Sequence, residues 1–256
     1  MRNQPRYRLA MDEPLASGQS VLLSGNAAHY FGHVLRLKPG ERLSLFNATD
    51  GEFVARIVHV GKKEISVIVE ERLRAPEHGT GLTVCFAPIK GGRLETIIEK
   101  ATELGADVLQ PVLTQRSVVD KVNLQRAESI AREAAEQCER TSWPIMREPL
   151  KLLKLLGDWP GDMPLIYGDE SGAGRPVMQA LTLAVPVRWG VLIGPEGGFA
   201  PEEFAALAKV KNAIGVGLGP RILRADTAVI TLCVATLMAW GDWHRAPRFN
   251  RGDTDA

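Results

Sequence analysis

Strand-like and helix-like patterns alternate along the chain from Leu82 onwards, and this alternation limits the fold more than any other feature. The stretch LTVCFAPI is continuously apolar, as a buried strand is, and the helix pattern RLETIIEKATELG follows it with Gly105 as its stop. Further strands are expected at DVLQPVL, MPLIYG, VRWGVLIG and AIGVGLG, and further helices from Asn123 to about Glu139, from Pro201 and from about Asp226. Such alternation predicts a largely parallel α/β sheet, which binds its ligands beyond the carboxyl ends of its strands.

The first part of the chain has a different pattern. The segments VLLS, RLSLFN, EFVARIVHV and EISVIVEE are short and rich in Val and Ile, and turn residues such as NATDG separate them. One helical segment, NAAHYFGHVLRL, interrupts these strands, and KPGE stops it. We therefore expect a small β-barrel domain over residues 1–73, a linker over 74–81, an α/β domain over 82–243 and a disordered tail over 244–256.

Composition narrows the classes of protein that are possible. The chain has 256 residues, of which 45% are hydrophobic, and 31 basic against 30 acidic side chains leave a net charge of +1. This balance decides little about nucleic-acid binding, because such binding needs only a local basic face. The N-terminus lacks the apolar core of a signal peptide, and the longest apolar run, Val229 to Trp240, is shorter than the roughly 20 residues of a membrane span. We therefore expect a cytoplasmic protein with no membrane partner.

The cysteines give no sign of metal or thiol chemistry. Cys85, Cys138 and Cys233 stand singly in apolar segments, without the spacing of a metal site, and the five histidines add none. Each cysteine is expected to be a small buried hydrophobic residue in a reducing compartment, and no metal is expected.

Two of the expected strands end in similar loops, VLIGPEGGFAPEEF (191–204) and VGLGPRILRADTA (216–228). Glycines let the backbone come close to a flat heterocycle such as adenine and hydrogen-bond its edge. The second loop does not complete the dinucleotide motif G-x-G-x-x-G, because Pro220 occupies the third glycine position. A plain glycine turn before a helix, with Glu202 and Glu203 in its first turn, remains an alternative for the first loop. The glycines in question are Gly194, Gly197, Gly198, Gly217 and Gly219.

A third stretch, EAAEQCERTSWP, lies at the end of an expected helix. Glu133, Gln137 and Arg140 fall on one stripe of that helix. A solvent-exposed polar face is the simpler interpretation of this spacing taken alone.

Taken together, these stretches resemble a known family, the RsmE-type methyltransferases of small-subunit (16S) ribosomal RNA, which modify N3 of a uridine and belong to the SPOUT class. The matching segments are HYFGHVLRLKPGE, KGGRLETIIEKATELGADVLQPVLTQRSVV, AAEQCERTSWP, LIGPEGGFAPEE and LGPRILRADTA, in this order from about Tyr7 to Trp243. The resemblance implies a PUA-like N-terminal barrel for RNA and a parallel-sheet α/β domain whose last segments thread a trefoil knot. It also implies a homodimer that binds S-adenosyl-L-methionine and a small ribosomal subunit.

The resemblance assigns roles to particular residues. It places the cofactor between the two loops, and uridine N3 needs a base, or cations near O2 and O4, because N3 carries a proton. Glu196 is expected to favour a sulfonium electrostatically. The expected cofactor-binding residues are Leu192, Gly194, Pro195, Glu196, Gly197, Gly198, Leu218, Gly219, Ile222 and Leu223. The expected catalytic residues are Arg221, Arg224 and Arg140, and the expected RNA-binding residues are Arg2, Arg6, Arg8, Arg36 and Lys38.

One departure from the family pattern leaves other functions open. Ala225-Asp226 stands where the family usually has Thr-Glu, and we expect Asp226 to cap the last helix rather than to act in catalysis. Two alternatives remain: another SPOUT-class enzyme that acts on transfer RNA or on a ribose hydroxyl, and a ribosome-assembly factor that binds RNA but has lost turnover.

Overall fold

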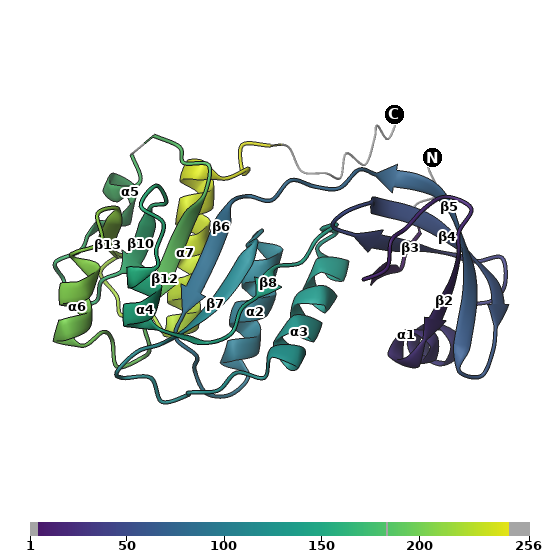
Figure 1. Ribbon diagram of the computed structural model, residues 1–256, viewed down its shortest axis with the longest axis horizontal. Coiled ribbons are helices and arrows are strands. Elements are labelled where there is room, and N and C mark those ends of the chain that lie inside the picture. The colour runs from purple at the N-terminus through teal and green to yellow at the C-terminus, as the bar shows by residue number, and fades with distance from the viewer. Residues whose placement is uncertain (1–4, 183, 246–256) are drawn as a thin grey trace. The chain divides into compact units, whose positions relative to one another are not determined.

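The computed structural model describes residues 5–182 and 184–245 (Figure 1). The chain forms two compact units. The first combines the residues up to His78 with Ser129–Trp143, and the second combines Gly79–Glu128 with the residues from Pro144 onwards. Within the described residues, no helix is long and apolar enough to cross a membrane.

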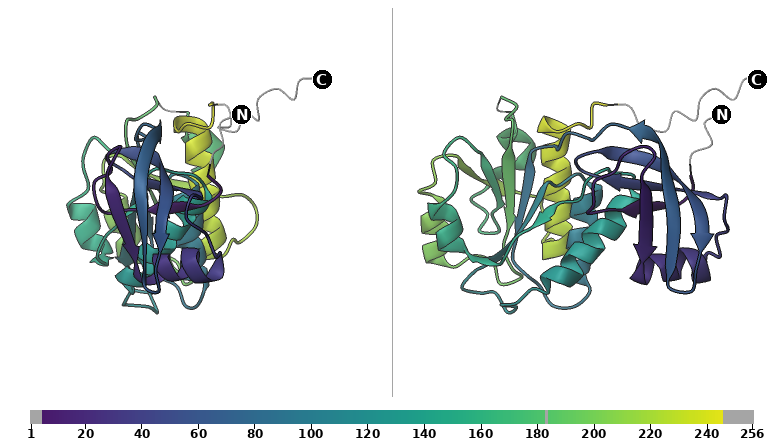
Figure 2. Two further views of the ribbon diagram at one scale, coloured as in Figure 1. Left: turned by 90° about the vertical axis from the view of Figure 1, so that its right-hand side faces the viewer. Right: turned by 45° about the vertical axis from the view of Figure 1, so that its right-hand side comes forward.

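The first unit contains a five-stranded sheet in the order β1-β3-β4-β5-β2 (Figure 2). Pairing is antiparallel except between β1 and β3, which are parallel. Side chains of β2 alternate between exposed and buried, as the sequence pattern predicts for a sheet with one covered face. Leu43, Leu45, Ile57 and Ile65 are fully buried in the core of this unit. The strands are β1 (Arg8–Ala10), β2 (Ser20–Ser24), β3 (Arg42–Asn47), β4 (Gly51–Val60) and β5 (Glu64–Arg74).

The helical segment expected between the barrel strands is shorter than predicted and ends in a wider turn. An α-helix, α1 (Gly25–His29), changes at Tyr30 into a π-helical turn, η1 (Tyr30–Val34). The backbone N–H of Leu35 bonds the carbonyl of Tyr30, five residues earlier. Arg36 then takes a left-handed conformation, with φ of 56°, and ends the segment before Leu37.

The second unit is built on a parallel sheet of eight strands, as the alternating pattern predicts. Its order is β11-β13-β10-β12-β6-β7-β8, with β9 paired to β7, and each of these pairings is parallel. The strands are β6 (Leu82–Phe86), β7 (Val108–Leu113), β8 (Ile145–Met146), β9 (Leu150–Lys151), β10 (Leu165–Gly168), β11 (Arg175–Pro176), β12 (Trp189–Ile193) and β13 (Ala213–Gly217). The helices are α2 (Arg93–Glu103), α3 (Leu124–Gln137, shared between the units), α4 (Leu152–Gly157), α5 (Val177–Ala180), α6 (Pro201–Leu207) and α7 (Ala225–Trp240).

Helices cover the central strands of this sheet. Helix α7 contacts β12, β6 and α2, whereas α4 contacts α6 and β7 (Figure 1). Every residue of β12 is buried, which is typical of a parallel strand covered on both faces. Trp189 of β12 meets Trp240 of α7 edge to face, with ring centroids 5.9 Å apart. Because β13, β10 and β12 are neighbours, their carboxyl ends lie side by side.

The division of the chain bears on the expected domain limits. Residues Ser129–Trp143, which include most of EAAEQCERTSWP, belong with the first unit although they come from the middle of the expected α/β domain. The expected disordered tail, 244–256, lies outside the described residues from 246 onwards.

Candidate active site

The carboxyl ends of three neighbouring strands surround a cavity of about 730 Å³ in the second unit. The loops after β10, β12 and β13 and the first turns of α7 line it. This is where a parallel α/β sheet binds ligands, and the volume is that of a small-molecule site. A second cavity, of about 500 Å³, lies beside α4 and α6 and shares no lining residue with the first.

The loop after β12 is a tight turn held by a neighbouring acid. The backbone N–H of Gly198 donates to the carbonyl of Pro195 at 2.8 Å, and Gly198 has a φ of 69°. Glu170, from the loop after β10, accepts the backbone N–H of Phe199 at 2.8 Å. A Cβ atom on Gly198 would lie 2.0 Å from Oε1 of Glu170, so any other residue would displace the Glu170 side chain and strain the left-handed backbone.

The loop after β13 presents bare backbone and apolar side chains. Gly219 has a φ of 105°, and a Cβ atom there would have no neighbour within 4 Å. Leu218, Ile222 and Leu223 line the same cavity, and Ile222 is fully exposed. The backbone N–H of Asp169 donates to the carbonyl of Val216 at 2.9 Å, which joins the end of β13 to the loop after β10.

Three arginine side chains lie at or beside the edge of the cavity. Arg116 lines it and donates from a guanidinium nitrogen to the carbonyl of Gly197 at 2.8 Å. Arg93, at the start of α2, pairs with Glu196 at 3.2 Å. Arg221 also lines the cavity and is exposed.

The structure brings most of the expected cofactor-binding residues to this one cavity. Three of the expected cofactor-binding and catalytic residues do not line it, namely Leu192, Arg224 and Arg140. Leu192 is fully buried in the core of the unit beside Cys85 and Leu165, because its side chain points into the sheet packing. Arg224 is exposed and occupies the N-cap position of α7, outside the residues that line the cavity. The expected residues that do line it are Gly194, Pro195, Glu196, Gly197, Gly198, Leu218, Gly219, Arg221, Ile222 and Leu223.

The sequence analysis missed the loop after β10 and Arg116. Asp169, Glu170, Gly172 and Gly174 line the cavity, and the segment GDESGAG is a third glycine-rich strand end. Its glycine-rich composition could have marked this loop as a further candidate for ligand binding. However, β10 and β13 are neighbours only through the strand order of the sheet, which the sequence pattern does not predict.

The expected capping role of Asp226 is not observed. The N-cap of α7 is Arg224, and Asp226 lies in the first turn beyond it. Its Oδ1 atom is buried and has no hydrogen-bond partner among the described residues. A carboxylate in the first turn still favours the helix through the helix dipole.

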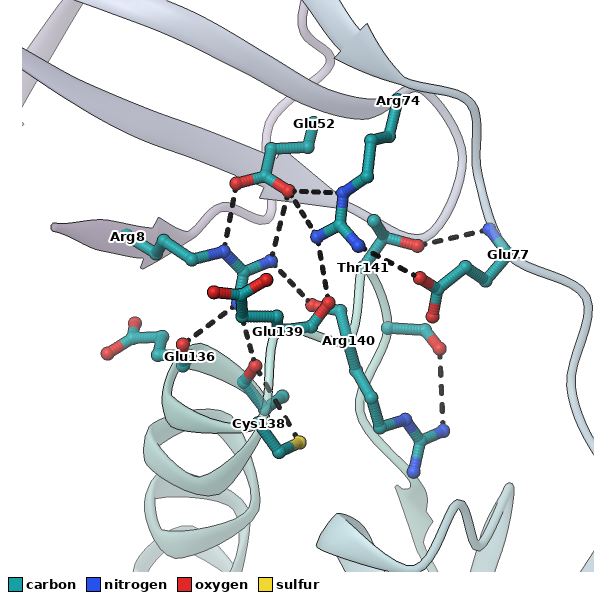
Figure 3. Close-up of polar contacts among 11 residues, drawn as sticks. Arg8, Glu52, Arg74, Glu77, Glu136, Cys138, Glu139, Arg140 and Thr141 are labelled. Atoms are coloured by element: carbon teal, nitrogen blue, oxygen red, sulfur yellow. Dashed lines mark hydrogen bonds and ion pairs between the residues drawn. The ribbon is translucent and has the colours of Figure 1, made fainter. Parts of the chain in front are cut away.

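The EAAEQCERTSWP segment is held in the first unit by two arginines and a buried acid (Figure 3). Arg8 donates to Glu52 at 2.9 Å, to the carbonyls of residues 135 and 136 at 2.9 Å each, and to the carbonyl of Arg140 at 2.8 Å. Arg74 donates to the same carboxylate, at 2.8 Å from its Nε, and to the carbonyl of Glu139 at 2.8 Å. We call Arg8, Glu52 and Arg74 the clamp, since they satisfy the last carbonyls of α3.

Burial and charge act in opposite directions on the pKa of Glu52 in the clamp. Burial alone raises the pKa of the Glu52 carboxyl, but the hydrogen bonds and charges of Arg8 and Arg74 outweigh it and hold the pKa below its ordinary value. Nearby, burial raises the pKa of Glu136, whose carboxylate accepts the backbone N–H of Ala10 at 3.0 Å.

The contacts of the clamp do not fit the expectation that Arg8 binds RNA. Arg8 is not available as a phosphate contact, because its side chain is only 7% exposed and its donors are used inside the unit. Arg6, Arg36 and Lys38 are exposed, and Arg2 lies outside the described residues. Arg140 is buried in the first unit, and its guanidinium is 3.5 Å from the hydroxyl of Ser142.

Thiol chemistry has no support in the structure. Burial raises the pKa of Cys85 and of Cys233 to about 12, so neither thiol ionises near neutral pH. Cys138 is half-buried rather than buried. Over residues 5–182 and 184–245, no three His, Cys, Asp or Glu side chains form a group that could hold a metal ion.

Comparison with known proteins identifies the class of protein to which this chain belongs. The family described as "RNA methyltransferase domain" matches residues 76–237, and the family described as "RNA methyltransferase PUA domain" matches residues 23–70. The glycine-lined cavity on a parallel sheet, in a chain that also carries a PUA barrel, therefore defines an RNA methyltransferase of the SPOUT type.

Relatives specify the family within this class. The chain is 34% identical to the ribosomal RNA small subunit methyltransferase E of Rickettsia conorii over 88% of this chain and 92% of that protein. The crystal structure of the ribosomal RNA small subunit methyltransferase E from Neisseria gonorrhoeae bound to S-adenosyl methionine is 27% identical, with a TM-score of 0.83, and the match covers 93% of this chain and 99% of that one. The structure of the protein Lpg2936 from Legionella pneumophila, in complex with the bound cofactor SAM, is 30% identical with a TM-score of 0.82 over 92% of this chain and 98% of that one. The chain belongs to the ribosomal RNA small subunit methyltransferase E family, as its motifs predict.

Proposed function

We propose that this protein transfers a methyl group from S-adenosyl-L-methionine to N3 of a uridine in the ribosomal RNA of the assembled small subunit. The observation that carries the proposal is the glycine-lined cavity at the ends of β10, β12 and β13. Two of its structural relatives, from Neisseria gonorrhoeae and Legionella pneumophila, are methyltransferases solved with this cofactor. The uridine N3 position comes from the resemblance of the motifs.

The cavity residues fit such a cofactor. Bare backbone at Gly219 and the turn at Gly198 offer N–H and C=O groups to an adenine edge, and the apolar side chains of the loop after β13 offer walls for its faces. Acids suit the cationic part of the molecule, and Asp169, Glu170 and Glu196 all line the cavity. When bound, the cofactor supplies an electrophilic methyl group on a sulfonium.

The protein's own part in the reaction is alignment and control of charge. Uridine N3 becomes a good nucleophile only when its proton leaves, and negative charge then spreads over O2 and O4. Arg221, exposed on the cavity, is the residue we assign to stabilise that charge. Arg224, exposed at the start of α7, is proposed to position the nucleotide.

The assembly is part of the same proposal. We infer a homodimer in the cytoplasm whose last segments form a trefoil knot. Support for the dimer comes from α7, which is apolar on nearly every side and leaves Met238 exposed, with exposed Trp243 just beyond its end. Sedimentation at micromolar concentration tests the dimer, and a protein that sediments only as a monomer would contradict it.

A methyl-transfer assay tests the function. Purified protein is mixed with cofactor carrying a labelled methyl group and with unmodified small ribosomal subunits, and the RNA is digested and its nucleosides identified by mass. We expect labelled 3-methyluridine, and a rate at least roughly tenfold lower for Arg221→Ala, because one charge-stabilising donor typically contributes that much or more. Arg175→Ala, an exposed arginine of β11 outside the cavity lining, is the matched control.

Other labelled products would favour one of the alternative functions. A nucleoside labelled on its ribose, or labelling of transfer RNA supplied in place of the subunits, would favour a different SPOUT-class substrate. No labelled nucleoside, from protein that binds the cofactor, would favour a binding factor without turnover and contradict the proposal.

A further inference from the structure

Two arginines contact the GPEGG turn from loops that lie across β12 from the loop after β10. The sheet order β10-β12-β6-β7 places the loops after β6 and β7 on that other side (Figure 1). Arg93 begins α2, which follows β6, and Arg116 follows β7. Arg93 pairs with Glu196 at 3.2 Å, and Arg116 donates to the carbonyl of Gly197 at 2.8 Å. Both guanidinium groups therefore lie beside two adjacent residues of the turn.

The segment that carries Arg116 is fixed by hydrogen bonds. The backbone N–H of Thr114 donates to the hydroxyl of Ser117 at 3.0 Å, and the backbone N–H of Gln115 donates to the carboxylate of Glu203 at 2.8 Å. Glu203 is 2% exposed, and its other oxygen accepts a backbone N–H at the start of α6 at 2.8 Å. Because this backbone is already ordered, Arg116 loses less conformational entropy when it binds a ligand.

Arg116 keeps its positive charge available. Its side chain is exposed on the cavity, and within the part of the chain that the structure describes it pairs with no carboxylate. The bond to Gly197 uses one guanidinium nitrogen, which leaves further N–H groups of the planar fork for a phosphate. The adjacent acid, Glu196, is paired with Arg93, so these three side chains together carry one positive charge.

The acids of the loop after β10 contact a different part of the GPEGG turn. Glu170 meets Gly198, whereas the Arg116 stem lies against Gly197, where an added Cβ atom would be 3.4 Å from Cβ of Arg116. Asp169 and Glu170 suit the cationic groups of a cofactor. The cavity thus combines acids in the loop after β10 with an unpaired arginine in the loop after β7, and this arginine complements an anion.

We infer that Arg116 binds a backbone phosphate of the RNA beside the nucleotide that enters the cavity, and that Arg93 neutralises Glu196 so that this acid does not repel the phosphate. The inference rests on the proposed function, because it specifies how the same cavity holds its RNA substrate. A nucleotide that leaves its stack brings its flanking phosphates to the mouth of the pocket, and contacts to phosphates fix the position of the base.

The cofactor carries an anion too, but the RNA is the better partner for Arg116. The carboxylate of S-adenosylmethionine is balanced by the ammonium group on the same carbon atom. A phosphate of the RNA backbone has no such neighbour and carries a full negative charge. An exposed arginine beside the cavity is also within reach of a long chain that remains largely outside it.

Arg116→Gln separates the charge from the contact with the turn, because glutamine keeps an N–H donor for the carbonyl of Gly197 but has no charge. A fluorescently labelled, uridine-containing single-stranded RNA is titrated with the full-length protein at several salt concentrations, without the methyl donor. We expect roughly fivefold weaker binding and a salt slope lower by about 0.7, the value for one lost phosphate contact. Arg188→Gln, at an exposed arginine paired with Asp162 outside the cavity lining, is the matched control and should bind as the wild type does.

Binding of the cofactor shows whether Arg116 binds RNA or S-adenosylmethionine. Calorimetric titration of Arg116→Gln with S-adenosylmethionine should give the dissociation constant of the wild type. A loss of affinity for S-adenosylmethionine, with no loss for its decarboxylated analogue, would mean that Arg116 binds the carboxylate of the cofactor, and the inference would be wrong.

Arg93 should act through Glu196 and not through a contact of its own with the RNA. Arg93→Ala leaves the charge of Glu196 uncompensated beside Arg116, so RNA binding should weaken by about threefold. Glu196→Gln added to this variant should restore the affinity of the wild type. A double variant that binds as weakly as Arg93→Ala would contradict the neutralising role of Arg93.

Unchanged RNA affinity and an unchanged salt slope in Arg116→Gln would overturn the inference. The melting temperature of this variant should equal that of the wild type, since the altered side chain is exposed. The titrations need no methyl transfer, so the two proposals can fail separately. Weaker RNA binding by Arg116→Gln without labelled 3-methyluridine from the wild type would remove only the proposed reaction, and labelled product with unchanged RNA binding would remove only the role of Arg116.

Discussion

At the scale of single residues, the two acids at the GPEGG turn have different surroundings. Glu196 is paired with Arg93, whereas Glu170 lines the cavity and accepts only a backbone N–H in the contacts described above. We therefore expect Glu170 to provide more of the negative charge that favours a cationic ligand. Sequence analysis favoured Glu196, because it lies inside the recognisable motif.

Binding of S-adenosylmethionine and S-adenosylhomocysteine tests this assignment, because only the first carries a sulfonium charge. Glu170→Gln should reduce the preference for S-adenosylmethionine by roughly threefold or more, with solvent screening limiting the effect. Glu196→Gln makes the same change of charge in the same cavity and should alter the preference less. If Glu196→Gln has the larger effect on the calorimetric ratio of dissociation constants, the assignment is wrong.

At the scale of elements, the clamp fixes the end of α3 to the barrel strands. Glu52 is 6% exposed and neutralises Arg8 and Arg74 together. Removing the charge of Glu52 leaves two guanidinium groups at a buried site without their acid, so Glu52→Gln should lower the free energy of unfolding by about 3 kcal/mol. Glu70 also pairs with two arginines, Arg42 and Arg56, but Glu70 is half-buried and both arginine side chains are exposed, so Glu70→Gln should cost about 0.5 kcal/mol.

The pH dependence of unfolding tests whether the charge of Glu52 stabilises the clamp. Because the folded-state pKa of Glu52 is lowered, its stabilisation is complete above the ordinary value of 4.5 and is lost as the pH falls towards the lowered value. The difference between wild type and Glu52→Gln, measured by denaturant titration, should therefore shrink below about pH 4.5. A difference that is constant with pH would mean that packing, and not charge, holds the clamp together.

At the scale of the whole molecule, local patterns predicted the elements but not their partners. The alternation after Leu82 predicted the parallel sheet, and the two Gly-Pro loops proved to line one cavity. The burial of Arg8 was not predictable, because it depends on carbonyls more than 120 residues away in the chain. Arg116 and the loop after β10 were missed for the same reason, since strand order brings them to the cavity.

The central claim is that the cavity at the ends of β10, β12 and β13 binds S-adenosylmethionine. The most direct measurement is a calorimetric titration of the wild type, Gly198→Ala and Gly157→Ala with this cofactor. An added Cβ atom at Gly198 meets Glu170, whereas at Gly157 it meets no atom within 4 Å. We predict that the wild type and Gly157→Ala bind equally and that Gly198→Ala binds at least roughly tenfold more weakly, because the Cβ atom displaces Glu170 and strains the left-handed backbone of the GPEGG turn. A wild type that does not bind, or Gly198→Ala that binds as tightly as the wild type, would contradict the account.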